Sequence, residues 1–280
     1  MNSSITRRGF CSLAAAPLLA SAGSTPVPIG LELYSVRDRL KDELEPTLQA
    51  VAKMGYQVVE FFSPYFDWTP ERAKQVRTML DSNNLRCLST HNGPQSFTSD
   101  GLKHAAELNN ILGTRFVVFA SAGNVKTVDG WKKVAETLSQ ADDKLKSSGL
   151  HSGYHNHQLE FRKIDGVLPM AVLAENTPST VMLQLDVGTC VEDGVNPVDW
   201  INSHPGRIRS CHLKDWSPKE GYKVLFGEGV VKWKEVLTAA AKTGGAQYFL
   251  IEQEGSRFNS LETARRCLAN YHQLNLNLAA

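Results

Sequence analysis

Short apolar runs alternate with longer amphipathic stretches along the chain from about residue 27 onward. The short runs are rich in Val, Ile, Leu and Phe, which is typical of strands buried on both faces of a parallel sheet. They predict strands at Gly30–Tyr34, Gln57–Phe62, Arg86–Thr90, Phe116–Phe119, Gly153–His157, Val181–Asp186, Ile208–Leu213 and Tyr248–Glu252. The amphipathic stretches predict helices at Glu43–Met54, Pro70–Ser82, Gly101–Leu112, Gly130–Ser148, Leu168–Asn176, Pro197–Asn202, Val231–Lys242 and Leu261–Leu274.

This alternation predicts a single α/β domain, a closed (β/α)8 TIM barrel over residues 27–280. Glycines that suit left-handed helix ends follow four of the predicted helices: Gly55, Gly113, Gly149 and Gly244. An open, doubly wound sheet is the main alternative, and it normally carries a glycine-rich phosphate loop after its first strand. Here residues 33–38 follow the first strand and contain no glycine, so the barrel is favoured.

The first residues have the pattern of an export signal. Arg7 and Arg8 precede an apolar stretch, Cys11–Ala20, and small residues follow it. Adjacent arginines followed by Gly-Phe are typical of a twin-arginine signal, so residues 1–26 are predicted to be a signal peptide with a short linker. We therefore expect the twin-arginine export machinery as a partner and a periplasmic or secreted protein that is exported folded. An uncleaved membrane anchor is disfavoured, because a spanning helix needs about 18 apolar residues.

Composition and charge exclude several classes of function. Hydrophobic residues make up 42% of the chain and charged residues 21%, which supplies enough apolar material for a full core. The formal net charge is +1 and no block of basic residues occurs, so neither a nucleic acid nor an anionic membrane is expected as a partner. A small-molecule substrate suits this near-neutral chain, and the composition leaves open whether it forms a homo-oligomer.

Polar residues gather where the predicted strands end. Four strands end in pairs of polar residues spaced two apart, so that both members of a pair face the same side. The pairs are His155 and His157, Gln184 and Asp186, His212 and Lys214, and Glu252 and Glu254. In a barrel these ends converge, and imidazole and carboxylate groups that converge form a site for one divalent metal ion, with Mn²⁺, Mg²⁺, Co²⁺ and Zn²⁺ all suitable. The predicted ligands are His155, Asp186, His212 and Glu252.

Other polar and aromatic residues near the strand ends are predicted to contact a substrate. They are Glu32, Tyr34, Glu60, His91, Trp216 and Glu254. Aromatic rings suit stacking on the C–H face of a sugar, although they more often belong to a core. The segment Gly227-Glu228-Gly229 is weak evidence for a phosphate site, and phosphorylated sugars are scarce outside the cytoplasm, so a non-phosphorylated sugar is favoured.

Seven segments together resemble the sugar phosphate isomerase/epimerase family, the xylose isomerase-like TIM barrels. They are Gly30–Asp38, Gly55–Glu60, Gly153–His157, Leu185–Gly188, His212–Asp215, Gly227–Gly229 and Ile251–Glu254. The resemblance implies a divalent metal held by a carboxylate from the fifth strand and by the residues matching Asp186, His212 and Glu252. Many relatives have Glu-Asn-His at the end of the fifth strand, where this chain has His-Asn-His, so His155 stands in the place of the glutamate. Glu160 is the other candidate for the missing carboxylate.

The resemblance implies an isomerase or epimerase that acts on a non-phosphorylated sugar or keto-sugar through an enediolate. Glu252 or Glu160 is the expected base, and His157 or Lys214 is expected to stabilise or protonate oxygen. The same intermediate permits loss of a β-oxygen substituent, so a lyase or dehydratase acting on a keto-sugar or 3-keto-glycoside is the alternative, as is a non-catalytic sugar-binding barrel. A metal-dependent nuclease of the endonuclease IV type would need a basic rim, which the net charge of +1 does not supply.

Structural roles compete with these assignments. Asp186 also suits the N-cap of a helix, and His212 also suits a satisfied core position. Glu252 and Glu254 would repel each other at close range unless a cation lies near both. The ammonium of Lys214 could supply that charge in place of a metal.

Overall fold

The computed structural model describes residues 26–276 and 278. The predicted signal peptide and linker, residues 1–26, lie outside this range except for Pro26, so the export signal stays a prediction. None of the described helices combines the length and the apolar composition needed to cross a bilayer.

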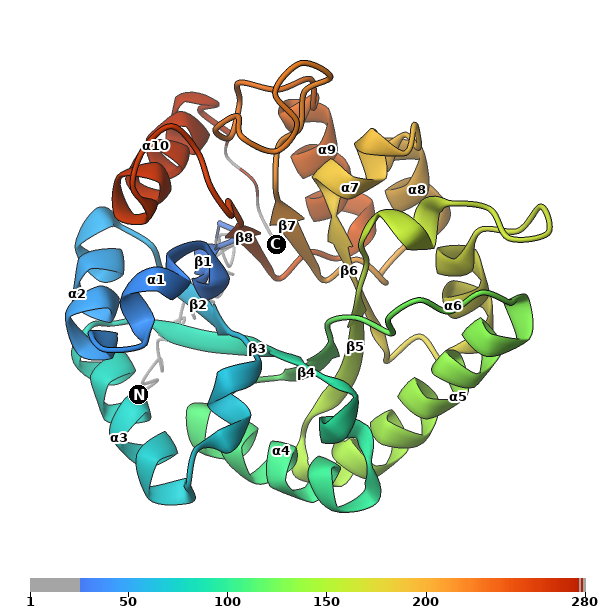
Figure 1. Ribbon diagram of the computed structural model, residues 1–280, viewed down its shortest axis with the longest axis horizontal. Helices are drawn as coiled ribbons and strands as arrows, with labels where there is room; N and C mark the ends of the chain where they lie inside the picture. Colours follow the sequence, from blue (N-terminus) through green and yellow to red (C-terminus); the bar gives the residue numbers. More distant parts are fainter. Residues whose placement is uncertain (1–25, 277, 279–280) are drawn as a thin grey trace, which may run out of the picture.

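Eight parallel strands close into a barrel, which confirms the predicted fold. The strands are β1 (Ile29–Glu32), β2 (Val58–Phe61), β3 (Arg86–Asn92), β4 (Phe116–Phe119), β5 (His151–His155), β6 (Met182–Asp186), β7 (Ser210–Leu213) and β8 (Tyr248–Ile251). Each strand pairs with its neighbours in chain order, and β1 pairs with β8 to close the sheet on itself. Figure 1 shows these strands in the middle of a ring of helices.

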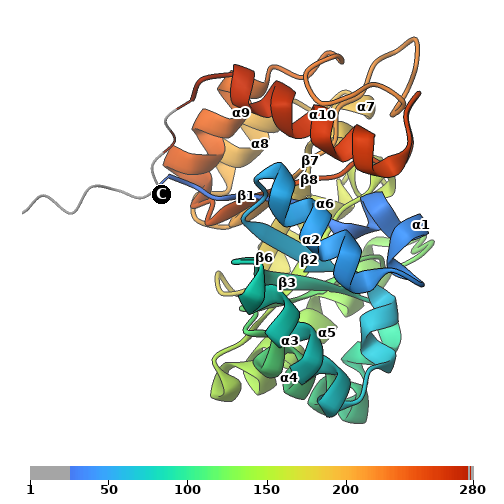
Figure 2. The ribbon, with the colours of Figure 1, turned by 90° about the vertical axis from the view of Figure 1, so that its left-hand side faces the viewer.

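The helices cover the outside of the barrel. They are α1 (Arg37–Leu40), α2 (Leu44–Met54), α3 (Pro70–Ser82), α4 (Ser99–Leu112), α5 (Val128–Leu145), α6 (Pro169–Asn176), α7 (Val187–Glu192), α8 (Pro197–Ser203), α9 (Trp233–Ala239) and α10 (Ser260–Gln273). The short helices α1 and α7 were not among those predicted, because each has too few residues to show a helical period. Figure 2 shows α1 projecting at one end of the barrel, beyond the long helices α2 and α10.

Glycines end several helices in the left-handed conformation. Gly55, Gly113 and Gly149 have positive φ angles, as predicted from their positions. After α9 the residue with positive φ is Gly245 (78°), not Gly244 as predicted. The reason is a π-helical turn, Ala240–Gly244, which carries the backbone on through Gly244 before the helix ends.

The barrel interior is apolar near the start of the strands and polar near their ends. Side chains from the first part of five strands form a small buried cluster: Val58, Leu88, Phe116, Val118, Met182, Tyr248 and Leu250. Closer to the strand ends, Glu60, His91, Gln184 and His212 are also buried inside the barrel. This change from apolar to polar places the chemistry of the molecule at the C-terminal end of the barrel, the usual location of function in this fold.

Candidate active site and metal centre

A cavity of about 580 Å³ lies at the C-terminal ends of the strands. Eight of the predicted site residues line it: Glu32, Tyr34, His91, His155, His157, Lys214, Glu252 and Glu254. Asp186 and His212 are completely buried and contact residues of this lining. The structure therefore brings together at one cavity side chains from strand ends that are far apart in the sequence.

Three of the four predicted metal ligands converge at one point. His155, Asp186 and Glu252 each offer a ligand atom, and these atoms all lie within 4.8 Å of one another. The Oδ1 atom of Asp186 accepts a hydrogen bond from the backbone N–H of Thr189 (2.9 Å) and so caps α7, whereas its Oδ2 atom has no hydrogen-bond partner. The Nδ1 atom of His155 is also buried without a partner.

These orphaned atoms fit a cation. Buried polar atoms are normally hydrogen-bonded, and a ligand atom without a partner is explained where an ion completes its surroundings. The helix-cap role and the metal-ligand role of Asp186 are compatible, because each uses a different carboxylate oxygen. Burial, followed by the neighbouring histidines and Lys214, holds the pKa of His155 well below its usual value, so its imidazole is neutral and able to bind a metal.

His212, the fourth predicted ligand, lies between two carboxylates. It is next to Asp186 in the register of β6 and β7. Its Nε2 atom lies 2.7 Å from Glu60 Oε2, and its Nδ1 atom lies 3.1 Å from Glu252 Oε2. Burial by itself would lower the pKa of His212, but its contacts with Glu252 and Glu60 outweigh burial and raise it well above the usual value. Glu60 thereby orients the ring so that Nδ1 faces the converging ligands, as carboxylates beside metal-binding histidines commonly do.

Lys214 lies among the acidic residues of the site. Its Nζ atom is 3.2 Å from Glu252 Oε2 and 3.6 Å from Asp186 Oδ2, and it also contacts Glu254. Burial would raise the pKa of Glu252, but Lys214 and His212 outweigh that effect and hold it well below its usual value. The sequence left open whether a metal ion or the ammonium of Lys214 compensates the charges of Glu252 and Glu254. The structure contains the salt bridges from Lys214 to both residues.

Glu60 was predicted to bind substrate, yet it lies below the cavity and is completely buried. It contacts His212, accepts hydrogen bonds from Gln184 Nε2 (3.1 and 3.2 Å) and lies 3.3 Å from His91. Burial would raise the pKa of Glu60, but His91 and His212 bring it down to about 2. Its position supports a role in orienting His212. Gln184 was overlooked as a site residue, although its place two residues before Asp186 already indicated an inward-facing side chain.

Glu160 does not reach the cavity. Its buried carboxylate accepts one hydrogen bond from the hydroxyl of Tyr154 (2.6 Å) and another from the backbone N–H of His157 (2.9 Å). It therefore stabilises the turn after β5. Because it does not line the cavity, its position does not support the predicted role as base or metal ligand. His157, at the start of this turn, does line the cavity.

Trp216 does not line the cavity either, although Tyr222 in the same loop does. The buried carboxylate of Asp215 organises this loop, because it accepts hydrogen bonds from the backbone N–H groups of Gly227 (2.8 Å) and Gly229 (3.1 Å). A Cβ atom on Gly229 would lie 2.1 Å from Asp215 Oδ1, so only glycine fits there. The Gly-Glu-Gly segment thus wraps around Asp215, and the role of Trp216 in substrate binding is not supported by its position.

Comparisons with known proteins agree with this fold. The sequence pattern of the xylose isomerase-like TIM barrel matches residues 48–271. An inosose dehydratase from Lacticaseibacillus casei is 21% identical over 264 residues, which cover 79% of this chain and 86% of that protein. The structure of a sugar phosphate isomerase/epimerase from Parabacteroides distasonis ATCC 8503 has a TM-score of 0.78 at 24% identity, covering 94% of this chain and 100% of that one. The IOLI protein, solved with a bound zinc atom, has a TM-score of 0.70 at 14% identity, covering 88% and 97% of the two chains.

Proposed function

Because the chain belongs to the xylose isomerase-like TIM barrel family, we propose that it is a metal-dependent enzyme that removes the proton next to the carbonyl of a keto-sugar. The observation that carries this proposal is the convergence of ligand atoms from His155, Asp186 and Glu252 beside a cavity of about 580 Å³. Two buried atoms of this group, His155 Nδ1 and Asp186 Oδ2, have no hydrogen-bond partner. A cavity of this size suits a small-molecule substrate. A divalent ion held by these three residues, and by His212 after its imidazole loses a proton, would act as a Lewis acid on the carbonyl oxygen.

Glu252 is the proposed base. Its low pKa keeps the carboxylate ionised at neutral pH, so that it can take the proton from the carbon beside the carbonyl and leave an enediolate. Lys214 lies beside it and stays protonated, because Glu252, Asp186 and Glu254 outweigh the effect of burial and raise the pKa of Lys214 well above its usual value. The ammonium can therefore donate a hydrogen bond to substrate oxygen as negative charge develops there.

The charge of the cavity favours a substrate without phosphate. Lys214 is the only Lys or Arg among the residues that line it, and its charge already faces three carboxylates. Glu252 and Glu254 also line the cavity. Glu32 lines it too, but burial and then the neighbouring Glu60 raise the pKa of Glu32 well above its usual value, so it adds little negative charge. A phosphate group would be repelled by these acidic side chains, whereas the hydroxyl groups of a neutral keto-sugar can donate hydrogen bonds to them.

For the step after proton removal we propose elimination of a β-oxygen substituent. The electrons of the enediolate form a C=C bond, the C–O bond breaks, and the leaving oxygen takes the proton that Glu252 had removed. The inosose dehydratase that resembles this chain over most of its length supports such a reaction. The chain also has His155 where the resemblance implies a second glutamate, and Glu160 is engaged outside the cavity, so the paired glutamate bases of an epimerase are lacking. Isomerisation is the second candidate, because Glu252 could return its proton to the neighbouring carbon from the same side.

The proposal is tested by incubating the metal-loaded protein with a panel of keto-sugars and 3-keto-glycosides in D₂O. We expect deuterium to enter the carbon beside the carbonyl of the recovered substrate, because proton removal is reversible. We expect Glu252→Gln to slow this exchange by a factor on the order of 10³. Loss of water or of the aglycone from the product would indicate elimination, whereas an unchanged product mass with a moved carbonyl would indicate isomerisation.

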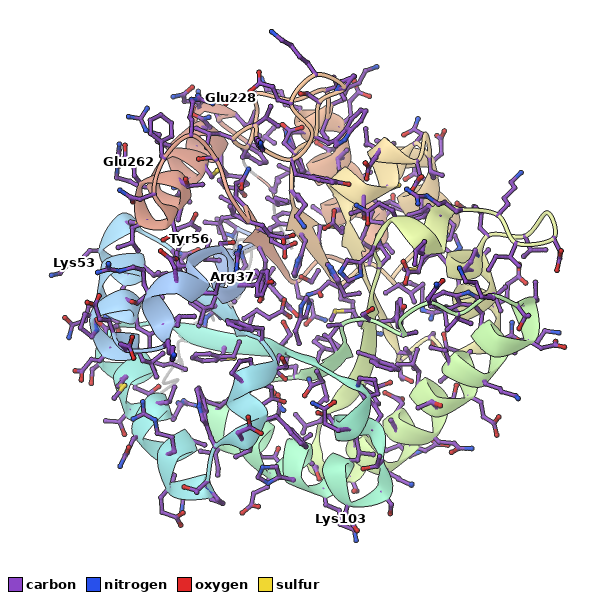
Figure 3. The ribbon with its side chains drawn as sticks, viewed as in Figure 1. Arg37, Lys53, Tyr56, Lys103, Glu228 and Glu262 are labelled. Atoms are coloured by element: carbon purple, nitrogen blue, oxygen red, sulfur yellow. The ribbon has the colours of Figure 1, made fainter. Side chains whose placement is uncertain are left out.

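A matched control is Glu262→Gln, on the outer helix α10 at the edge of the molecule in Figure 3. This variant should exchange deuterium at the rate of the unaltered protein. A protein that binds keto-sugars equally well with and without Glu252→Gln, and that incorporates no deuterium in either case, would be a sugar-binding barrel and not an enzyme.

A further inference from the structure

A second cavity of about 490 Å³ lies beside the candidate active site, between α1 and the turn that follows β2. Phe62, which directly follows β2, is part of the lining of both cavities. Its ring packs edge-to-face against Tyr34 of the active-site cavity, with 5.2 Å between ring centroids. The two cavities therefore adjoin at Phe62.

Aromatic side chains form one wall of this second cavity. Trp68 packs edge-to-face against Phe61 (5.1 Å between centroids) and against Tyr65 (6.0 Å). Phe61 and Tyr65 are buried, whereas the Trp68 side chain is only half-buried, so part of its surface faces the cavity. Rigid aromatic walls of this kind bind a flat aromatic ring by stacking and edge contacts.

Apolar Leu40, Leu44 and Pro64 also line the second cavity, and basic residues lie beside them. Arg37, Lys41 and Arg72 lie there together with a single acidic residue, Asp42. In the part of the chain that the structure describes, none of the three basic residues forms a salt bridge. The guanidinium of Arg37 is held in place by hydrogen bonds to the carbonyl oxygens of Tyr34 (2.8 Å) and Glu254 (3.0 Å). The two neighbouring cavities thus have opposite charge, because the active-site cavity is acidic and this one is basic.

We propose that the second cavity binds an aromatic group with an acidic substituent, and that this group is the aglycone of a glycoside whose sugar ring occupies the active-site cavity. The aromatic wall accounts for the ring, and the unpaired cations account for the acid, which a carboxylate satisfies through hydrogen bonds to guanidinium or ammonium groups. Phe62 lies at the junction of the two parts. The inference deepens the proposed function and rests on it only for the sugar part of the substrate.

Binding of 4-hydroxybenzoate to the full-length, metal-loaded protein tests the aromatic site directly, by titration calorimetry. We expect Trp68→Ala and Arg72→Gln each to weaken this binding by about tenfold, and phenol, which lacks the carboxylate, to bind about tenfold more weakly than 4-hydroxybenzoate. The control is Lys103→Gln on α4, far from Arg37 in Figure 3, which should bind like the unaltered protein. The site is excluded if Trp68→Ala and Arg72→Gln bind 4-hydroxybenzoate as well as the unaltered protein, or if that protein binds none.

A linked ligand tests whether the two cavities act together. The 4-carboxyphenyl β-glucoside should bind at least about tenfold more tightly than methyl β-glucoside, because the second contact becomes intramolecular. This gain should disappear in Trp68→Ala, and an equal affinity for both glucosides in the unaltered protein would overturn the proposal.

Repeating these titrations with Glu252→Gln separates this inference from the proposed function. A variant that no longer exchanges deuterium but still shows the gain from the linked aromatic acid supports the second cavity independently of the chemistry. If the unaltered protein exchanged deuterium into none of the keto-sugars, the proposed reaction would be refuted. The titrations with aromatic acids would still decide whether the second cavity is a binding site.

Discussion

The ammonium of Lys214 lies 3.2 Å from Oε2 of Glu252. The same carboxylate oxygen lies 3.1 Å from His212 Nδ1. The same ammonium lies 3.6 Å from the unpartnered Oδ2 of Asp186. Lys214 therefore partly neutralises the carboxylates that would hold a metal ion. An ammonium and a divalent ion repel each other at this range. We therefore expect Lys214 to turn toward Glu254, with which it is already in contact, when the ion binds.

Replacing Lys214 with Met should strengthen metal binding and weaken catalysis. Without the competing charge, the affinity for Mn²⁺ should rise by about tenfold, or about 1.4 kcal/mol. Turnover should fall, because the hydrogen-bond donor for the enediolate oxygen is lost. Metal titration by calorimetry and the D₂O assay measure the two effects, with Lys103→Met as the control. Unchanged metal affinity would mean that the ammonium and the ion do not share these carboxylates.

Asp186→Asn should remove metal binding without unfolding α7. The amide oxygen of Asn can still accept the hydrogen bond from Thr189 N–H, so the helix cap is kept while the charge at Oδ2 is lost. A metal at about 100 times its dissociation constant should stabilise the unaltered protein by about 2.7 kcal/mol, or roughly 5–10 °C in Tm, and a chelator should abolish this shift. The variant should show no such shift in thermal denaturation, whereas Glu262→Gln should keep it. A full metal-dependent shift in Asp186→Asn would place the ion elsewhere.

The repeated apolar and amphipathic segments were sufficient to predict the barrel, because strands buried on both faces and helices buried on one differ in period. The same rule predicted that the polar pairs at the ends of β5 to β8 lie on the same side of their strands, since alternate residues of a strand face the same side. Depth within the barrel was harder to predict. Glu60 and Glu32 are partners in the register of β1 and β2, yet Glu32 lines the cavity and Glu60 lies beneath it. The alternation of residues along a strand predicts whether a side chain faces the barrel interior. It does not predict how far along the barrel axis that side chain lies.

Loops without periodicity account for the other differences. The loop after β7 contains two aromatic residues near the site, Trp216 and Tyr222, and only the second reaches the cavity. Which of them does so depends on hydrogen bonds between distant loop positions and Asp215, and no local pattern encodes those bonds. Likewise, Glu160 was assigned by spacing alone, whereas its bonds to Tyr154 and to its own turn decide where it lies.

Replacing His155 with Glu should change the metal preference of the site. A carboxylate oxygen is a harder ligand than an imidazole nitrogen, so the affinity for Mn²⁺ relative to Zn²⁺ should increase, by about tenfold. The added negative charge also faces Lys214, which should keep the glutamate ionised. Competition titrations with the two metals measure this ratio, and His272→Glu on the exposed end of α10 is the control. A ratio that stays the same in His155→Glu would show that His155 is not a ligand.

Asp215→Asn should destabilise the protein and impair the active site from a distance. The carboxylate accepts hydrogen bonds from Gly227 N–H, Gly229 N–H and Trp233 Nε1–H, the last at 2.8 Å. These three donors all bind Oδ2, whereas Oδ1 accepts from the backbone N–H groups of Trp216 (2.8 Å) and Val231 (3.4 Å). The amide nitrogen of Asn would face one of these two sets of donors and leave their N–H groups unsatisfied, at a cost of about 3 kcal/mol or roughly 6–12 °C in Tm.

The same change should raise KM more than it lowers kcat, because the loop that Asp215 holds carries Tyr222 to the cavity but contains none of the proposed metal ligands or the base. Thermal denaturation and steady-state kinetics measure the two effects, and Asp199→Asn on the exposed surface of α8 serves as the control. If Asp215→Asn melted at the temperature of the unaltered protein, its carboxylate would not be what holds the loop. If it melted early but kept its KM, the position of Tyr222 would not depend on that carboxylate.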